Sequence, residues 1–84
     1  MNVQKKVVEI LMELSGLTKI KKTDRLMEEL SLDSLAMVTL LVEAEDQFGI
    51  EFLESDMNPF DLRTVEDVIH LVEKYGGGSN GIKN

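Results

Sequence analysis

The chain has 84 residues, a formal net charge of -7 and no cysteine, which leaves room for one small domain and excludes disulfide frameworks and thiolate metal sites. No lysine or arginine lies between Leu26 and Leu62, and this acidic stretch disfavours nucleic acid and favours a partner with a basic surface. No apolar run reaches the ~20 residues of a membrane span, and charges interrupt the N-terminal apolar pattern, so neither a membrane span nor a signal peptide is expected, and the protein is predicted to be cytoplasmic.

The first predicted element is an amphipathic helix over 3–14, which Gly16 ends. Its apolar face consists of Val3, Val7, Ile10, Leu11 and Leu14. A long connection follows over 17–31, and its scattered apolar residues are expected to hold it against the core. These residues are Leu17, Ile20, Leu26 and Leu30.

A second helix is predicted from Ser34 to Phe48, because this stretch has no glycine or proline and Gly49 follows it. Either Asp33 or Ser34 is expected to supply the oxygen that caps the helix N-terminus. The pattern places one set of apolar residues on the buried face, with Met37 and Val42 nearer its edge. The buried set is Leu35, Val38, Leu40, Leu41, Ala44 (or Glu45) and Phe48.

The remainder of the chain predicts one short helical turn near Pro59 and a last helix that starts at Thr64. Thr64 to Asp67 fit a capping box, and the apolar stripe that follows is Val65, Val68, Ile69, Val72 and Tyr75. The predicted fold is therefore all-α, a small bundle of three main helices plus one short helical turn. Residues 1–75 are expected to form the domain, and residues 76–84 a flexible tail.

Catalytic constellations are missing from the sequence. A nucleophilic Ser34 needs a base, and the single histidine, His70, lies in the middle of the last helix without an identifiable orienting acid. There is no phosphate-binding loop, no calcium loop and no His or Cys cluster, so no metal site is expected. A serine hydrolase is therefore disfavoured, and the protein is predicted not to be an enzyme.

Ser34 itself has two interpretations. It lies in the sequence Leu30-Ser31-Leu32-Asp33-Ser34-Leu35, at the start of the acidic second helix. On position alone it is either a helix cap or a hydroxyl that is presented for modification.

The order of features resembles the acyl carrier protein family. Asp33-Ser34-Leu35 opens an acidic helix that ends in Phe48-Gly49-Ile50, an amphipathic helix and a long loop precede it, and a Thr-Val-Glu-Asp helix follows. The resemblance covers the chain from about Val3 to Tyr75. It implies that Ser34 carries 4′-phosphopantetheine, which a phosphopantetheinyl transferase takes from coenzyme A, and that acyl or aminoacyl groups are held as thioesters on its thiol.

The resemblance also implies partners, namely the transferase, the enzymes that load the arm and the synthases that unload it, each with a basic docking patch. The carrier is expected to be a monomer. The residues predicted to dock are Asp33, Leu35, Met37, Val42, Glu43, Glu45 and Asp46.

Several positions depart from the pattern of fatty-acid carriers. Ser31 stands where they usually have glycine, Ala36 and Thr39 stand where they have acidic residues, and the run from Phe48 to Val65 is longer. These departures favour a carrier of a specialised pathway, for polyketides, modified fatty acids or nonribosomal peptides. Two alternatives stay open: a D-alanyl carrier of cell-wall decoration, although its motif usually ends in methionine, and a cofactor-free acidic helical module in which Ser34 is only a cap.

Overall fold

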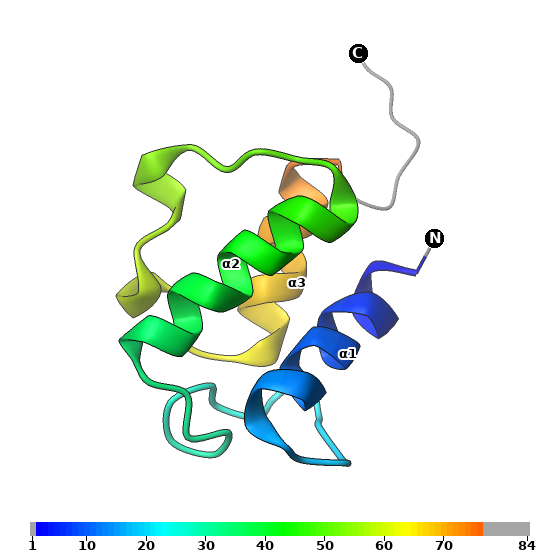
Figure 1. The fold of residues 1–84 in the computed structure, drawn as a ribbon, viewed down its shortest axis with the longest axis vertical. Helices are drawn as coiled ribbons and strands as arrows, with labels where there is room; N and C mark the ends of the chain where they lie inside the picture. The colour runs from blue at the N-terminus through cyan, green and yellow to red at the C-terminus, as the bar shows by residue number, and fades with distance from the viewer. Residues whose placement is uncertain (1, 77–84) are drawn as a thin grey trace.

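The computed structural model describes residues 2–76, and its elements are helices only. The α-helices are α1 (Val3–Ser15), α2 (Ser34–Phe48) and α3 (Val65–Lys74), and the 3-10 turns are η1 (Glu54–Asp56) and η2 (Pro59–Asp61). Figure 1 shows α2 in front of α3, with α1 beside them. The prediction of a small all-α bundle with three main helices is confirmed.

Local signals set the ends of the helices. Asn2 caps α1 by accepting a hydrogen bond from the Lys5 N–H, and Gly16 ends the helix in the left-handed conformation with φ 77°. Gly49 ends α2 in the same way, with φ 66°. These ends agree with the sequence predictions within one residue.

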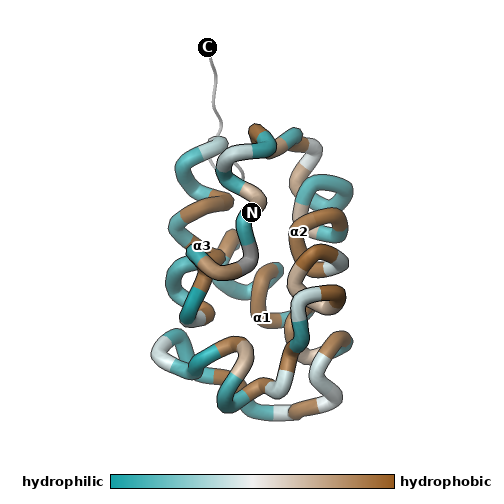
Figure 2. The backbone as a smooth tube through the Cα atoms, turned by 90° about the vertical axis from the view of Figure 1, so that its left-hand side faces the viewer, coloured by the Kyte–Doolittle hydropathy of each residue, from teal (hydrophilic) through white to brown (hydrophobic). Residues whose placement is uncertain are grey.

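The core lies where α1 packs against both α2 and α3. In Figure 2 hydrophobic and hydrophilic segments alternate along the helices, as expected for amphipathic packing. The largest fully buried side chains are Ile10, Leu11, Leu26, Met37, Leu40, Leu41, Val7, Val65, Val68 and Val72. Burial of these residues is the main source of stability.

The connection over 16–33 is held to the start of α3 by backbone hydrogen bonds. The Leu26 N–H donates to the Arg63 carbonyl at 2.8 Å, and the Val65 N–H donates to the Asp24 carbonyl at 3.0 Å. Leu26 and Leu30 are buried as predicted, whereas Leu17 is exposed, so its predicted contact with the core is wrong.

The connection over 49–64 contains two 3-10 turns, not the single turn that the sequence predicted. η1 precedes the turn that begins at Pro59, and its three residues are acidic or polar, a pattern without an apolar period. At the start of α3 the predicted capping box is present between Thr64 and Asp67. Of the predicted tail over 76–84, residues 77–84 lie outside the described residues.

Candidate functional site

Ser34 is the first residue of α2, and its side chain is exposed. Within residues 2–76 its hydroxyl has no hydrogen-bond partner. The cap is Asp33, whose Oδ1 accepts a hydrogen bond from the Ala36 N–H at 2.8 Å. Of the two cap candidates, Asp33 therefore caps the helix, and Ser34 is left available for another role.

The backbone around Ser34 forms the positive end of α2. The first intrahelical hydrogen bond joins the Met37 N–H to the Asp33 carbonyl at 2.9 Å, and Asp33 Oδ1 occupies the Ala36 N–H. The amides of Ser34 and Leu35 precede this bond, as the first amides of a helix do. Together with the helix dipole they favour a negative group on the Ser34 side chain.

The turn before Ser34 is anchored in the core by two buried leucines. Leu30 and Leu32 are buried, and the Leu32 N–H donates to the Leu26 carbonyl at 3.0 Å. Ser31, between them, has φ 59°, the left-handed region that glycine adopts at least cost. Because the chain reverses here in an anchored turn, Ser34 is presented at a fixed place.

The surface of α2 next to Ser34 is apolar. Leu35 is 75% exposed, Val42 is 50% exposed and Val38 is 42% exposed. Met37, which was predicted to dock partners, is fully buried, so this prediction is wrong. Leu35 and Val38 were both predicted to lie on the buried face of α2, and this prediction is wrong, because both lie on the exposed face with Val42.

The three acidic residues near the end of α2 do not have the same role. Asp46 is exposed and Glu43 is partly exposed. Glu45 Oε2, in contrast, accepts a hydrogen bond from the Phe52 N–H at 2.8 Å and so holds the chain that leaves α2. Glu45, which was predicted to dock partners, therefore also has a structural contact that holds this connection.

The end of α2 that is remote from Ser34 is tied to the end of α3. The Tyr75 hydroxyl accepts a hydrogen bond from the Leu53 N–H at 2.9 Å and donates one to Asp56, whose Oδ2 also lies 3.4 Å from Lys74 Nζ. The Tyr75 ring packs edge-on against Phe52 with centroids 5.0 Å apart. This cluster of Phe52, Leu53, Asp56, Lys74 and Tyr75 is called the tyrosine corner below.

Hydrogen bonding shifts the pKa values of two groups in the tyrosine corner. The donated bond from Tyr75, followed by the bond to Lys74, lowers the pKa of Asp56, although desolvation opposes it. Donation of this bond to Asp56 raises the pKa of Tyr75, because the bond is lost when the phenol ionises, and desolvation adds to the rise. Both shifts indicate that the corner is held by the ionised carboxylate and the neutral phenol.

Residues 2–76 contain neither a metal-ligand cluster nor a membrane-spanning helix. In the described part of the chain, no group of three or more His, Cys, Asp or Glu residues is arranged to hold a metal ion. No helix between residues 2 and 76 is long and apolar enough to cross a membrane. His70 is exposed, and its Nε2 lies 4.0 Å from Glu66 on the same helix.

Comparisons with known proteins agree with this geometry. Residues 5–72 match the family described as "Phosphopantetheine attachment site". An acyl carrier protein of Thermobifida fusca is 36% identical over 70 residues, which cover 81% of this chain and 86% of the relative. A D-alanyl carrier protein of Enterococcus faecalis is 40% identical over 75 residues, which cover 87% and 96%.

The fold has counterparts among solved structures. A Mycobacterium tuberculosis protein provisionally described as an acyl carrier protein superposes with a TM-score of 0.79 at 24% identity, covering 88% of this chain and 99% of the other. This likeness supports the fold, and the family match supports the cofactor. The chain belongs to the acyl carrier protein family, whose cofactor is 4′-phosphopantetheine.

Proposed function

We propose that Ser34 is the residue that carries 4′-phosphopantetheine, and that the protein holds acyl or aminoacyl intermediates on this arm for partner enzymes. The observation that supports this proposal most is the exposed Ser34 hydroxyl, which has no hydrogen-bond partner within residues 2–76 while its neighbour Asp33 caps the helix. A cap-only serine would instead accept the bond that Asp33 accepts. Residues 1–75 constitute the carrier domain in this proposal.

The chemistry of attachment fits the N-terminus of α2. The Ser34 Oγ attacks the β-phosphate of coenzyme A in the transferase, the proton of the hydroxyl is lost, and 3′,5′-adenosine bisphosphate leaves. The product is a phosphodiester with one negative charge. The amides and dipole at the start of α2 stabilise this charge, so the fold favours the modified state.

The partner surface in this proposal surrounds Ser34 on α2. Leu35 and Val42 supply exposed apolar area, Val38 adds to it, and Asp33, Glu43 and Asp46 supply negative charge. Partners with basic patches, the transferase and the loading and unloading enzymes, are attracted to this surface, and the charges increase the association rate more than the affinity.

The proposal is tested by intact mass. The purified chain is incubated with coenzyme A and a phosphopantetheinyl transferase of broad specificity, with Ser34→Ala as the comparison and an established carrier as positive control. The wild type should gain the mass of one phosphopantetheine, and Ser34→Ala should gain none. No gain in the wild type, while the positive control is modified, would contradict the proposal.

The docking surface is tested by charge reversal that spares Glu45. The double variant Glu43→Lys/Asp46→Lys should slow modification about tenfold at low salt and less at high salt, because screening weakens exposed charges. Glu9→Lys/Glu13→Lys on α1 has the same net charge and is the matched control. Equal slowing in both double variants would show that net charge, and not this surface, controls the rate.

The cargo belongs to a specialised pathway in this proposal, for a polyketide, a modified fatty acid or a nonribosomal peptide, because Ser31, Ala36 and Thr39 replace the usual residues of fatty-acid carriers. The 40% identity to a D-alanyl carrier protein favours a second candidate, a D-alanyl cargo. Incubation of the modified chain with an adenylating enzyme for D-alanine distinguishes the two, since a D-alanyl carrier should gain the mass of alanine.

A further inference from the structure

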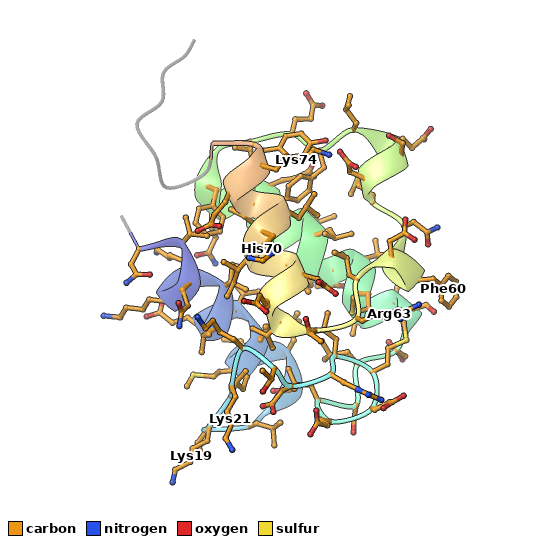
Figure 3. The ribbon with its side chains drawn as sticks, turned by 180° about the vertical axis from the view of Figure 1, so that it is seen from behind. Lys19, Lys21, Phe60, Arg63, His70 and Lys74 are labelled. Carbon is orange, nitrogen blue, oxygen red and sulfur yellow. The ribbon has the colours of Figure 1, made fainter. Side chains whose placement is uncertain are left out.

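A cleft lies between the connection over 25–28 and the segment that joins η2 to α3. Its volume is about 420 Å³, and it is lined by Arg25, Met27, Glu28, Phe60, Leu62, Arg63 and Thr64. η2 packs against α2, the helix that Ser34 begins. Figure 3 shows Phe60 and Arg63 together on this side of the molecule. A group on a long flexible arm at Ser34 can therefore meet this cleft.

The walls of the cleft are held in place by the backbone. The hydrogen bond from the Leu26 N–H to the Arg63 carbonyl, at 2.8 Å, joins one wall to the other, and Arg25 and Thr64 form an isolated antiparallel bridge. Leu62 is 7% exposed and anchors the segment in the core. The cleft therefore lies between two segments that are hydrogen-bonded to each other and anchored in the core.

Most polar groups of the cleft are already paired. Arg25 Nη1 lies 2.7 Å from Glu28 Oε1, and this bond raises the pKa of Arg25 and neutralises both charges. The Thr64 hydroxyl accepts the Asp67 N–H at 3.3 Å. The Arg63 guanidinium, in contrast, has no acidic partner within residues 2–76. The bonds of Arg63 are those of its backbone: the N–H donates to Asp67 at 2.9 Å, and the carbonyl accepts from the Leu26 N–H.

The cleft thus combines one uncompensated guanidinium with apolar surface in a protein of net charge -7. Met27 and Leu62 give the apolar surface, and the Phe60 side chain, 70% exposed, forms an aromatic rim. A planar guanidinium binds a carboxylate through two parallel hydrogen bonds and repels an ammonium group. The unpaired positive charge of Arg63 therefore favours negatively charged groups in the cleft over positively charged ones.

Given the proposed attachment at Ser34, on which this inference rests, we propose that the cleft receives the end of the tethered cargo and that Arg63 binds a carboxylate there. The cargo class is then an acyl group with a free carboxylate, such as a dicarboxylic half-thioester. An aminoacyl group, whose ammonium Arg63 repels, is disfavoured. Arg63 acts as a specificity-determining residue and takes no part in bond making.

The test compares three cargoes on the same ¹⁵N-labelled chain, installed from the coenzyme A thioesters: malonyl, its uncharged counterpart acetoacetyl, and alanyl. The measurement is the amide chemical shift of Met27, Phe60, Leu62, Arg63 and Thr64, relative to the chain with the unloaded arm. Malonyl should give shifts about twofold to fivefold larger than those of acetoacetyl, because an exposed charge pair contributes a free energy that corresponds to this range. Alanyl should give the smallest shifts. Arg63→Gln should remove the difference between malonyl and acetoacetyl.

Lys19→Gln is the matched control, because it removes one exposed positive charge from the 16–33 connection and lies apart from Arg63 in Figure 3. It should leave the malonyl shifts unchanged. Equal shifts with malonyl and acetoacetyl, larger shifts with alanyl, or shifts already complete with the unloaded arm would each overturn the inference and leave the attachment intact. A chain that accepts no arm at all overturns the proposed attachment and this inference together.

Discussion

The two ends of α2 differ in their contacts with the surrounding chain. At the N-terminal end, Ser34 and Leu35 are exposed, and the Ser34 hydroxyl has no hydrogen-bond partner in the described part of the chain. At the C-terminal end, Glu45 holds the Phe52 backbone and the tyrosine corner joins the following turn to α3. The groups at one end of the helix are exposed, and those at the other end hold the following turn against α3.

This difference indicates that function and stability are separable along one helix. Replacement of the Ser34 side chain should abolish modification and leave stability nearly intact, whereas changes at the tyrosine corner should lower stability and leave modification unchanged. Substitutions at each end of α2 test that separation.

Ser34→Ala should abolish modification completely. Because Asp33 supplies the cap, the free energy of unfolding should change by less than about 0.5 kcal/mol, as is usual for an exposed substitution. Urea denaturation measures the free energy, and intact mass measures modification. A loss of several kcal/mol would mean that Ser34 supports the fold, which would remove the contrast between the two ends.

Tyr75→Phe should lower the free energy of unfolding by about 1–2 kcal/mol, because it removes the acceptor for the Leu53 N–H and the donor to Asp56. The ring contact with Phe52 is retained, so the loss comes from the hydrogen bonds. Urea denaturation of both proteins measures it. The rate of modification should be unchanged, and a slower rate would show that the two ends of α2 are coupled.

The tyrosine corner should also make stability depend on pH. The folded pKa of Asp56 is below that of an unfolded aspartate, so its contribution is complete above about pH 3.9 and is lost as pH falls through the folded pKa. The raised pKa of Tyr75 gives the opposite sign: its contribution is complete below about pH 10 and is lost as pH rises through the folded pKa.

The pH dependence is measured as the difference in melting temperature between wild type and Tyr75→Phe. The difference should be constant near neutral pH and should shrink at both extremes. A difference that grows in acid would contradict the assignment of the Asp56 carboxylate as the acceptor.

Asp33→Ala should cost about 1 kcal/mol of stability, because the Ala36 N–H loses its acceptor. Asp33→Asn keeps a cap oxygen and should cost only a few tenths of a kcal/mol, so it serves as the control. Thermal denaturation of the pair separates capping from charge. An equal loss in both variants would show that the charge of Asp33, and not its hydrogen bond, stabilises α2.

Ser31→Gly should have the smallest effect, a gain of no more than about 1 kcal/mol. Glycine adopts the positive φ of this position without strain, but it also increases the entropy of the unfolded chain. Ser31→Ala keeps the strain without the hydroxyl and is the comparison variant. A loss of stability in Ser31→Gly would show that the Ser31 side chain, and not its backbone, determines the turn.

The sequence predicted the helix ends well because their signals are local. Gly16, Gly49 and the Thr64–Asp67 capping box each act within a few residues, and each is present in the structure. Asp33 and Ser34 were both candidate caps, since each has the right chemistry at the right place, and only the observed hydrogen bond distinguished them.

The buried face of α2 was predicted less well because the helix is apolar on two sides. The buried face is Met37, Leu40, Leu41 and Ala44, whereas Leu35, Val38 and Val42 lie on the exposed side. Both sets recur at helical spacing, so periodicity alone does not choose between them. Which face is buried depends on the packing of α1 and α3, which is a tertiary effect.

The tyrosine corner was not predicted because its contacts are distant in sequence. Tyr75 was assigned to an apolar stripe, and its hydroxyl instead meets a backbone amide 22 residues away. The role of Glu45 in bonding Phe52, seven residues on, was missed for the same reason. Side-chain to backbone bonds of this kind have no periodic signature in the sequence.

The position of the arm decides whether Ser34 is the attachment site, because Ser31 and Ser34 are both exposed and lie close together in the chain. The modified chain is digested, and fragmentation of the peptide that contains residues 31–39 locates the phosphopantetheine by mass. The group should lie on Ser34 alone. A group on Ser31 or Thr39, or an unmodified peptide from a chain treated alongside a modified positive control, would contradict this prediction.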